Sequence, residues 1–197
     1  MTTSTIPTDN LWGVPCLDPA LQPDSITQPV LAWGSRARGS ANTGTWHFYV
    51  DDYRFGSALA NPDNVARTGC IATCEPNITM RDHTTRAEAL WGTFQKRRVA
   101  ALLQARSVRI FVDLCFPAEL TELCMLGVPW GWRAFATRGF AARPDELRAE
   151  HELACQWAGR DPLFLVVGGG ELIRAVCLEL RGAVWCPGHR PKKHGQR

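Results

Sequence analysis

Five short apolar runs, each ending in polar residues or glycine, constrain the fold of this chain more than any other feature. The runs are TWHFYV, IATC, RIFV, AFAT and LFLVV, and they lead into Asp51, Glu75, Asp113, Arg138 and Gly168. Short continuous runs rich in β-branched and aromatic residues are typical of strands buried in a parallel sheet. Because parallel strands end at one common edge, where ligands bind in α/β folds, we expect these polar residues to lie together.

Helical patterns separate the apolar runs, so the chain alternates between strand and helix. This alternation predicts an α/β fold with a mainly parallel sheet and right-handed crossovers. The pattern gives about six strands, at residues 46–51, 69–75, 108–114, 132–139, 163–167 and 183–187. We favour a partial TIM-like barrel over an open doubly wound sheet, because several crossovers are short and each strand ends on a polar group.

The clearest helical signal is the segment TTRAEALWGTFQKRRVAALLQARS. Thr85 followed three residues later by Glu88 matches a capping box, which predicts the start of the helix. Apolar residues then recur at three- and four-residue spacing and predict the buried face, at Ala87, Leu90, Trp91, Phe94, Ala101 and Leu102. We expect Lys96, Arg97 and Arg98 to interrupt this face as a mostly exposed basic turn.

The composition predicts three regions along the chain. Residues 1–45 are rich in Pro, Thr, Ser and Gly, and we expect an irregular arm pinned to the domain by apolar residues such as Leu11, Trp12 and Val14. Residues 46–187 form a single α/β domain, and residues 188–197 a flexible basic tail. The net charge of +3 comes from this tail, since without its four basic residues 18 remain against 19 acidic ones.

Residue usage also bears on the compartment. No apolar run approaches the roughly 18–20 residues that a membrane helix needs, and the N-terminus shows no secretory signal. We therefore expect a cytoplasmic protein with no membrane partner, whose eight cysteines are reduced, mostly buried thiols. A zinc site is not expected, because Cys186 and His189 have no second closely spaced pair of ligands.

The carboxylates that end the predicted strands are the candidate catalytic residues: Asp51, Asp52, Glu75 and Asp113. Oxygen ligands suit Mg²⁺ or Mn²⁺, so Asp51, Glu75 and Asp113 are also the candidate metal ligands. Two alternatives remain open. The carboxylates could act as acid and base on a sugar or ester, or they could pair with Arg54, Arg81 or Arg138 and hold the edge together.

Substrate contacts are expected from cations and from one glycine turn. Arg54, Arg81 and Arg138 could hold phosphate oxygens, and His83 could reach the substrate, whereas we expect His47 to pack in or against the core. Gly168, Gly169 and Gly170 precede a helix, where bare backbone N–H groups can approach a phosphate. Glu171 opposes this role through its charge, so a simple tight turn, or a metal contact through Glu171, is the alternative.

The ordered segments LWGVP, HFYVDDYRF, EPN, LWGTFQKRR, FVDL, GWRAFATRG and LFLVVGGG resemble family 4417 of the domains of unknown function. This family occurs in phages, plasmids and bacterial genomes. The resemblance covers residues 10–187 and rests most on DDYRF. It implies a single-domain architecture and a mobile-element context, and it favours work on nucleic acid or nucleotides. The family has no established activity, so it implies no catalytic residues.

Three functions are therefore compatible with the sequence. The first is a metal-dependent enzyme that acts on phosphoesters of a nucleotide or nucleic acid. The second is a non-catalytic nucleic-acid or partner-binding protein of a phage or plasmid, which would use the tail, the basic turn at Lys96–Arg98 and exposed tryptophans. The third is a glycoside hydrolase with two catalytic carboxylates. The oligomeric state does not follow from the sequence.

Overall fold

A computed structural model describes residues 6–41 and 43–188. Its sheet has seven strands, all parallel, and each strand pairs with its neighbour in the sequence. The strands are β1 (Val30–Ala32), β2 (Thr45–His47), β3 (Ala72–Cys74), β4 (Arg109–Asp113), β5 (Ala134–Arg138), β6 (Leu163–Val167) and β7 (Ala183–Cys186). The expected α/β class with a mainly parallel sheet is confirmed.

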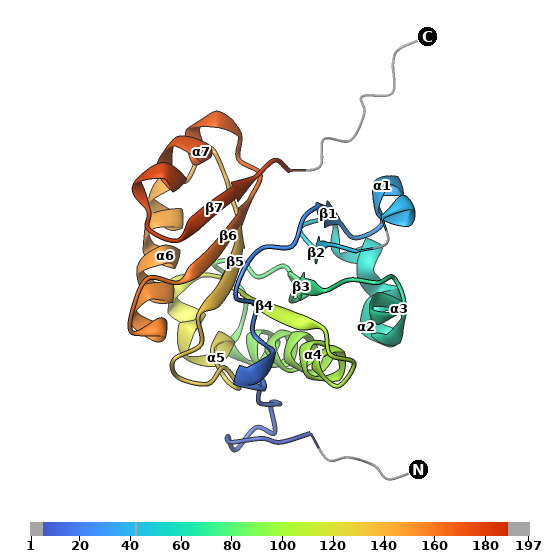
Figure 1. The fold of residues 1–197 in the computed structure, drawn as a ribbon. Helices are drawn as coiled ribbons and strands as arrows, with labels where there is room; N and C mark the ends of the chain where they lie inside the picture. The colour runs from blue at the N-terminus through green and yellow to red at the C-terminus, as the bar shows by residue number, and fades with distance from the viewer. Residues whose placement is uncertain (1–5, 42, 189–197) are drawn as a thin grey trace.

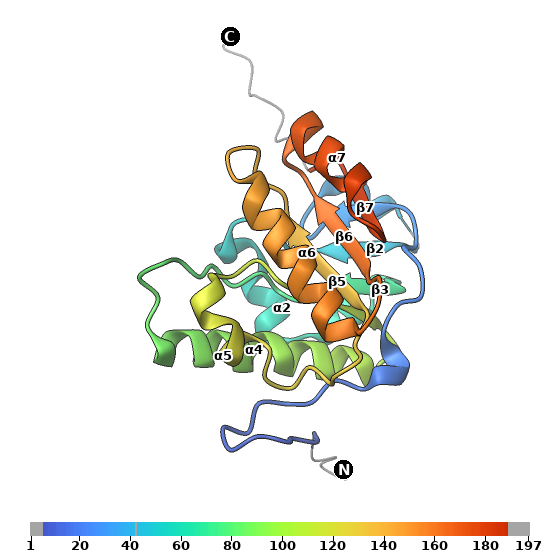
Figure 2. The same ribbon diagram turned by 90° about the vertical axis from the view of Figure 1, so that its left-hand side faces the viewer.

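Helices connect the strands and lie outside the sheet (Figures 1 and 2). They are α1 (Arg36–Ser40), α2 (Gly56–Ala60), α3 (Asp63–Ala66), α4 (Arg86–Gln104), α5 (Thr121–Cys124), α6 (Pro144–Ala158) and α7 (Gly170–Glu179), with short 3₁₀ turns η1 (Pro19–Leu21), η2 (Asp52–Phe55) and η3 (Ala118–Leu120). Sequential parallel strands with crossovers of one hand place all helices on one face, so the sheet curls into a nearly closed barrel. Within the described residues no ladder joins β7 to β1.

Both faces of the sheet are buried, which explains why the strands are continuous apolar runs. Alternate residues of each strand belong to different cores. In β4, Ile110 and Val112 pack in the outer core beneath the helices, whereas Phe111 packs in the inner core of the barrel. The inner core consists of Tyr49, Ala72, Cys74, Phe111, Ala134, Ala136, Leu165, Val167 and Cys186.

The N-terminal arm contributes more than the sequence predicts, because β1 comes from it. Residues 30–32 pair in parallel with β2 and make seven strands instead of six. A strand of three residues is too short to show a periodic pattern. Val14 anchors the arm as expected, but the expectation for Leu11 and Trp12 is wrong, since they are 101% and 61% exposed.

Helix α4 begins as expected but buries another face. The Thr85–Glu88 capping box is present. The buried residues of α4 are Ala89, Gly92, Thr93, Lys96, Arg97, Val99, Ala100, Leu103 and Gln104, whereas Trp91 is 59% exposed. The expected exposed basic turn is therefore wrong for Lys96 and Arg97, and only Arg98 is exposed. The two cations face inward because they pair with buried carboxylates at the ends of β3 and β4.

Two further expectations concern the whole chain. All eight cysteines are free thiols, and five of them are buried. None of the helices in the part of the chain described here is long and apolar enough to cross a bilayer. The basic tail, with Arg190, Lys192, Lys193, Arg197 and His189, lies almost wholly outside the described residues.

Candidate functional site

The parallel pairing brings the carboxyl ends of the strands to one edge of the barrel, as the sequence predicts. Two cavities lie at this edge. The first, which we call the glycine cavity, has a volume of about 770 Å³ and is lined by His47, Tyr49, Arg138–Arg143, Val167–Glu171, Trp185, Pro187 and Gly188. The second, which we call the acidic cavity, has a volume of about 690 Å³.

The glycine turn between β6 and α7 forms one wall of the glycine cavity. Gly168, Gly169 and Gly170 all have positive φ angles, of 87°, 78° and 71°. Only Gly169 also needs glycine for space, because a Cβ there would lie 2.4 Å from Cγ1 of Ile173. Gly169 is the N-cap of α7 and offers no side-chain acceptor to the first N–H groups of the helix. The positive end of α7 is therefore left uncapped beside the cavity.

Charged groups beside the turn make the glycine cavity suitable for an anion. Arg138, at the end of β5, and Arg143, before α6, both line it. Glu171 also lines it, but its carboxylate lies 3.3 Å from Arg174 in an ion pair one turn along α7. Guanidinium groups and bare helix N-termini are the usual partners of phosphate in proteins.

His47 and Tyr49 also line this cavity. Their rings stack with centroids 5.6 Å apart, and the backbone N–H of Tyr49 lies 3.3 Å from Nδ1 of His47. Tyr49 donates its hydroxyl proton to Oδ1 of Asp113 at 3.1 Å. Burial, and then the charge of Asp113, raise the pKa of Tyr49, so the phenol stays neutral and keeps this hydrogen bond.

Behind the cavity wall lie two buried ion pairs. Lys96 donates to Oδ2 and to the carbonyl oxygen of Asp113, at 3.4 and 3.3 Å. Arg97 pairs with Glu75 and also donates to the carbonyls of Leu126 and Cys124, at 2.9 and 2.7 Å. The other carboxylate oxygen of Glu75 accepts from the N–H of Asp113 at 3.2 Å. The ends of β3 and β4 are thus joined to α4 by charge-assisted hydrogen bonds.

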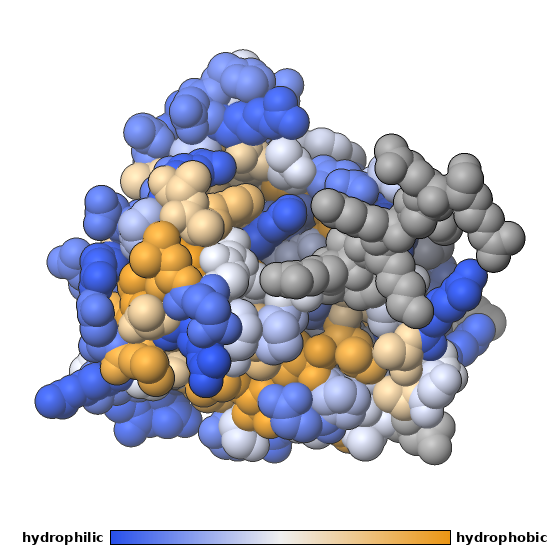
Figure 3. Space-filling model, turned by 90° about the horizontal axis from the view of Figure 1, so that it is seen from above, coloured by the Kyte–Doolittle hydropathy of each residue, from blue (hydrophilic) through white to orange (hydrophobic). Residues whose placement is uncertain are grey.

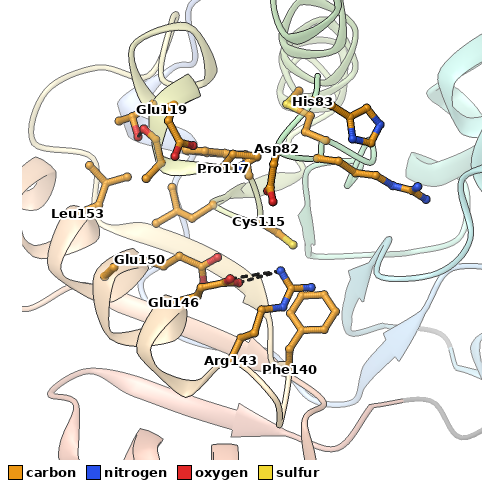
Figure 4. A pocket seen from close by; sticks show the side chains of 17 residues that line it. Asp82, His83, Cys115, Pro117, Glu119, Phe140, Arg143, Glu146, Glu150 and Leu153 are labelled. Atoms are coloured by element: carbon orange, nitrogen blue, oxygen red, sulfur yellow. Dashed lines mark hydrogen bonds and ion pairs between the residues drawn. The ribbon is translucent and has the colours of Figure 1, made fainter. Parts of the chain in front are cut away.

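The acidic cavity lies between α6 and the loops that follow β3 and β4. Figure 4 shows Asp82 and Glu119 on one side of it and Glu146 and Glu150 on the other. Arg143 donates to both oxygens of Glu146, at 3.1 and 3.2 Å. Burial raises the pKa of the half-buried Glu150 to about 8, with a further rise from the charge of Asp113. Glu150 is therefore mostly protonated at neutral pH.

The structure distributes the predicted site residues over several places. Arg138, Gly168, Gly169, Gly170 and Glu171 meet at the glycine cavity, and Arg81 and His83 line the acidic cavity. Glu75 and Asp113 lie together in the buried ion pairs. Asp51 and Asp52 are exposed, and Asp52 accepts from the N–H and hydroxyl of Thr79 at 3.1 and 2.8 Å. Arg54 donates to the carbonyl of Gly34 at 3.5 Å.

Two of the predicted metal ligands, Glu75 and Asp113, lie together, whereas Asp51 is exposed. Residues 6–41 and 43–188 contain no cluster of three His, Cys, Asp or Glu side chains that could hold a metal ion. Glu75 and Asp113 are engaged by Arg97 and Lys96. A requirement for Mg²⁺ or Mn²⁺ stays a prediction from the sequence.

Known proteins match this chain over much of its length. The chain matches the family described as domain of unknown function DUF4417 over residues 6–145. The chain belongs to this family. It is 27% identical over 135 residues to the Gene 1 protein of Mycobacterium phage L5, covering 64% of this chain and 57% of the phage protein. Its identity to the Gene 1 protein of Mycobacterium phage D29 is 25% over 133 residues, covering 64% and 48%.

These matches cover part of the site and part of the phage proteins. The chain spans about half the length of the phage proteins it matches. No solved structure is significantly similar. The DUF4417 match contains the buried ion pairs, His47 and Arg138, but it ends inside α6, before Glu150 and the glycine turn. The predicted association with phages is confirmed, and no activity follows from membership of the family.

The expectation that His47 packs in or against the core is confirmed, since this residue is only 2% exposed. Sequence reasoning missed Tyr49, Arg143 and Glu150 at this edge. His47 and Tyr49 alternate with Trp46 and Phe48, and this period of two indicates that they share a face opposite the outer core. No sequence pattern marks Arg143 or Glu150 as part of a site. Arg143 is the N-cap of the amphipathic helix α6, and Glu150 is one of many charged residues within that helix. Their proximity to the edge is a consequence of how α6 packs on β5.

Proposed function

We propose that the protein is an enzyme that hydrolyses phosphate esters, with the phosphate group bound in the glycine cavity. One observation carries the proposal: Arg138, the uncapped start of α7 and His47 line the same cavity at the carboxyl edge of a parallel barrel. This edge is the usual position of active sites in parallel α/β barrels. The family's presence in phages is compatible with a nucleotide-type ester but does not require it.

Each group has a distinct part in the proposed reaction. The guanidinium of Arg138 and the N–H groups at the start of α7 hold the phosphate oxygens and neutralise charge that builds up as the ester bond breaks. His47 exchanges a proton with the attacking water or the leaving oxygen, as histidine does near neutral pH. Tyr49, held by Asp113, is a positioning residue because its ring stacks on His47.

No step is assigned to a metal ion, although divalent cations commonly assist phosphoester chemistry. Of the three carboxylates predicted to bind a metal, Asp113 and Glu75 are paired with Lys96 and Arg97, and Asp51 is exposed. A cation could still accompany the substrate, which is why the assay below is run with and without Mg²⁺ and Mn²⁺.

A non-catalytic binding protein is the second candidate. Trp12, Trp91 and Trp130 are 61%, 59% and 71% exposed, and exposed aromatic side chains can stack on bases or on a partner. In the space-filling view of Figure 3 the face seen from above is mostly hydrophilic, with hydrophobic residues in separate areas. The burial of Lys96 and Arg97 removes the basic turn from this alternative.

The test combines binding with turnover in the full chain. Inorganic phosphate binding is measured by calorimetry, and hydrolysis of p-nitrophenyl phosphate and bis-p-nitrophenyl phosphate is measured with and without divalent cations. We expect Arg138→Gln to weaken phosphate binding about tenfold or more, because it removes hydrogen bonds to a charged ligand. His47→Gln should abolish turnover while phosphate still binds.

The control is Arg148→Gln, an exposed arginine of α6 that pairs with Glu179 and lines neither cavity. It should leave binding and turnover unchanged. Equal phosphate binding by wild type and Arg138→Gln would remove the proposed phosphate site. Phosphate binding without turnover of either ester, under every cation condition, would favour the binding protein instead.

A further inference from the structure

The glycine and acidic cavities share a wall, and this adjacency indicates which ester the site accepts. Phe140 and Arg143, from the loop between β5 and α6, line both cavities. A ligand that lies across this loop would therefore place one end in each cavity. The two ends would meet different chemistry, because the glycine cavity presents Arg138 and a helix N-terminus whereas the acidic cavity presents four carboxyl groups.

The acidic cavity has the walls and polar groups that an aromatic heterocycle needs. Apolar side chains line it from several elements, among them Met80, Phe116, Phe140 and Leu153. Four carboxyl groups share it with Arg81, His83 and Arg143, and Arg143 is already paired with Glu146. Such a cavity repels a phosphate group but accepts a ring that donates hydrogen bonds to carboxylates.

We infer that the substrate is a nucleoside monophosphate with an amino-bearing base, its phosphate in the glycine cavity and its base in the acidic cavity. This inference rests on the proposed function, since it assumes that the glycine cavity holds phosphate. Asp82 and Glu119, opposite Glu150 in Figure 4, can only accept hydrogen bonds when they are ionised. At position 6 an exocyclic amino group donates to such acceptors, whereas a keto base presents an acceptor oxygen there that ionised carboxylates repel.

Glu150 is the residue of the acidic cavity whose hydrogen-bonding groups best match the edge of an adenine ring. Its neutral carboxyl group offers a donor beside an acceptor, which complements the ring nitrogen and amino group of adenine. The groups that shift the pKa of Glu150 are Asp113 at the end of β4, Thr137 of β5, and Glu146 and Arg143 at the start of α6. Glu150 in turn raises the pKa of Cys115, in the loop after β4. Burial raises the pKa of Glu150 most and the charges of Asp113 and Glu146 add to the rise, while Thr137 and Arg143 oppose it.

The test compares four probes by calorimetry on the full chain: inorganic phosphate, adenosine, AMP and inosine monophosphate, which carries oxygen in place of the amino group. We expect AMP to bind at least about tenfold more tightly than either inorganic phosphate or inosine monophosphate. A difference of this size is what hydrogen bonds to charged groups contribute. Glu150→Leu should weaken AMP binding and leave the affinity for inorganic phosphate unchanged. Arg138→Gln should weaken both AMP and phosphate.

Glu150→Gln is the matched variant, because an amide keeps a donor beside an acceptor. It should retain tight AMP binding, and should retain it above pH 8, where wild-type Glu150 becomes charged and AMP binding weakens. Glu152→Gln, an exposed residue on the same helix that lines neither cavity, is the control. If Glu150→Leu does not fold, the contrast in pH dependence between wild type and Glu150→Gln decides the question.

The outcomes separate this inference from the proposed function. AMP that binds no more tightly than inorganic phosphate, or no more tightly than inosine monophosphate, would overturn the inference and leave the phosphate site intact. Failure of inorganic phosphate and AMP alike to bind would overturn both. Adenosine that binds to wild type and not to Glu150→Leu would place the base as proposed, independently of phosphate.

Discussion

The ammonium nitrogen of Lys96 lies 3.4 Å from Oδ2 of Asp113, and each side chain is only 1% exposed. The pair joins the middle of α4 to the end of β4, next to the carboxylate that holds Tyr49. Burial raises the pKa of Asp113, and the charge of Lys96 opposes that rise. A buried ion pair adds little stability over an apolar replacement, but removal of one partner leaves an uncompensated charge.

Lys96→Met should therefore lower the free energy of unfolding by about 3–5 kcal/mol, the usual cost of breaking a buried pair. Urea denaturation measures the change. Arg98→Met, at the neighbouring exposed position, should change it by less than about 0.5 kcal/mol. The double variant Lys96→Met with Asp113→Asn should be more stable than Lys96→Met alone, because no charge remains buried. A double variant no more stable than the single one would show that lost packing, not charge, is the cause.

Arg97→Lys should destabilise the protein although the charge is kept. The guanidinium of Arg97 donates to Glu75 and to the carbonyls of Leu126 and Cys124, from nitrogens in a fixed planar arrangement. A lysine cannot reach all three acceptors, so we expect a loss of about 2 kcal/mol or more from unsatisfied buried groups. Arg86→Lys, whose pair with Glu122 is exposed, should stay within about 0.5 kcal/mol in the same denaturation assay.

Glu150 should make stability depend on pH in a known direction. Its pKa is about 8 in the folded protein and near 4.5 when unfolded, so between these values the folded state binds more protons. The free energy of unfolding must then fall as pH rises from about 4.5 to about 8, and level off above. Glu150→Gln should lose this part of the slope, whereas Glu152→Gln should keep it. Thermal unfolding across this pH range is the measurement, and identical slopes in wild type and Glu150→Gln would contradict the prediction.

Two alanine substitutions in the glycine turn should separate backbone strain from close packing. Gly170→Ala meets no atom within 4 Å, so it should cost only the penalty of a left-handed residue, about 1–2 kcal/mol. Gly169→Ala has a similar φ, but its Cβ would also collide with Ile173 and with the backbone of Gly139. We expect a further loss of about 1–3 kcal/mol from overpacking. Equal destabilisation of the two variants, compared by chemical denaturation, would argue that the turn relaxes around the added methyl group.

How far the sequence predicts this protein differs between its elements. Every apolar run predicted as a strand contains one, because a strand buried on both faces has no polar side and stands out in the sequence. The first two of these strands are shorter than predicted: residues 46–51 and 69–75 are strand only within Thr45–His47 and Ala72–Cys74. The capping box of α4 is likewise local, since Thr85 and Glu88 bond within one turn. Strand β1 escaped prediction because three residues carry no period, and it exists only because β2 offers it an unpaired edge.

The buried face of α4 shows why the site was harder to predict. Periodicity counts apolar residues, and it placed Trp91 inside and Lys96 outside. The structure reverses this, because Glu75 and Asp113 end their strands beneath α4 and pair there with Arg97 and Lys96. A buried carboxylate without a partner costs more free energy than an exposed indole ring. That demand arises from residues about 20 positions away along the chain, so no window of local sequence contains it.

Hydrophobic runs and turn residues act locally, so the direction of the buried strands can be read from the chain, and with it the meeting of Glu75, Asp113, Arg138 and Gly168 at one edge. Which of these groups neutralise one another, and which remain open to a ligand, follows from the packing of the helices on the sheet. That choice depends on where α4 and α6 pack: α4 brings Lys96 and Arg97 to the carboxylates, and α6 brings Glu150 beside the cavity. Pairing of charges acts over a few ångströms in space, whatever their separation in the chain.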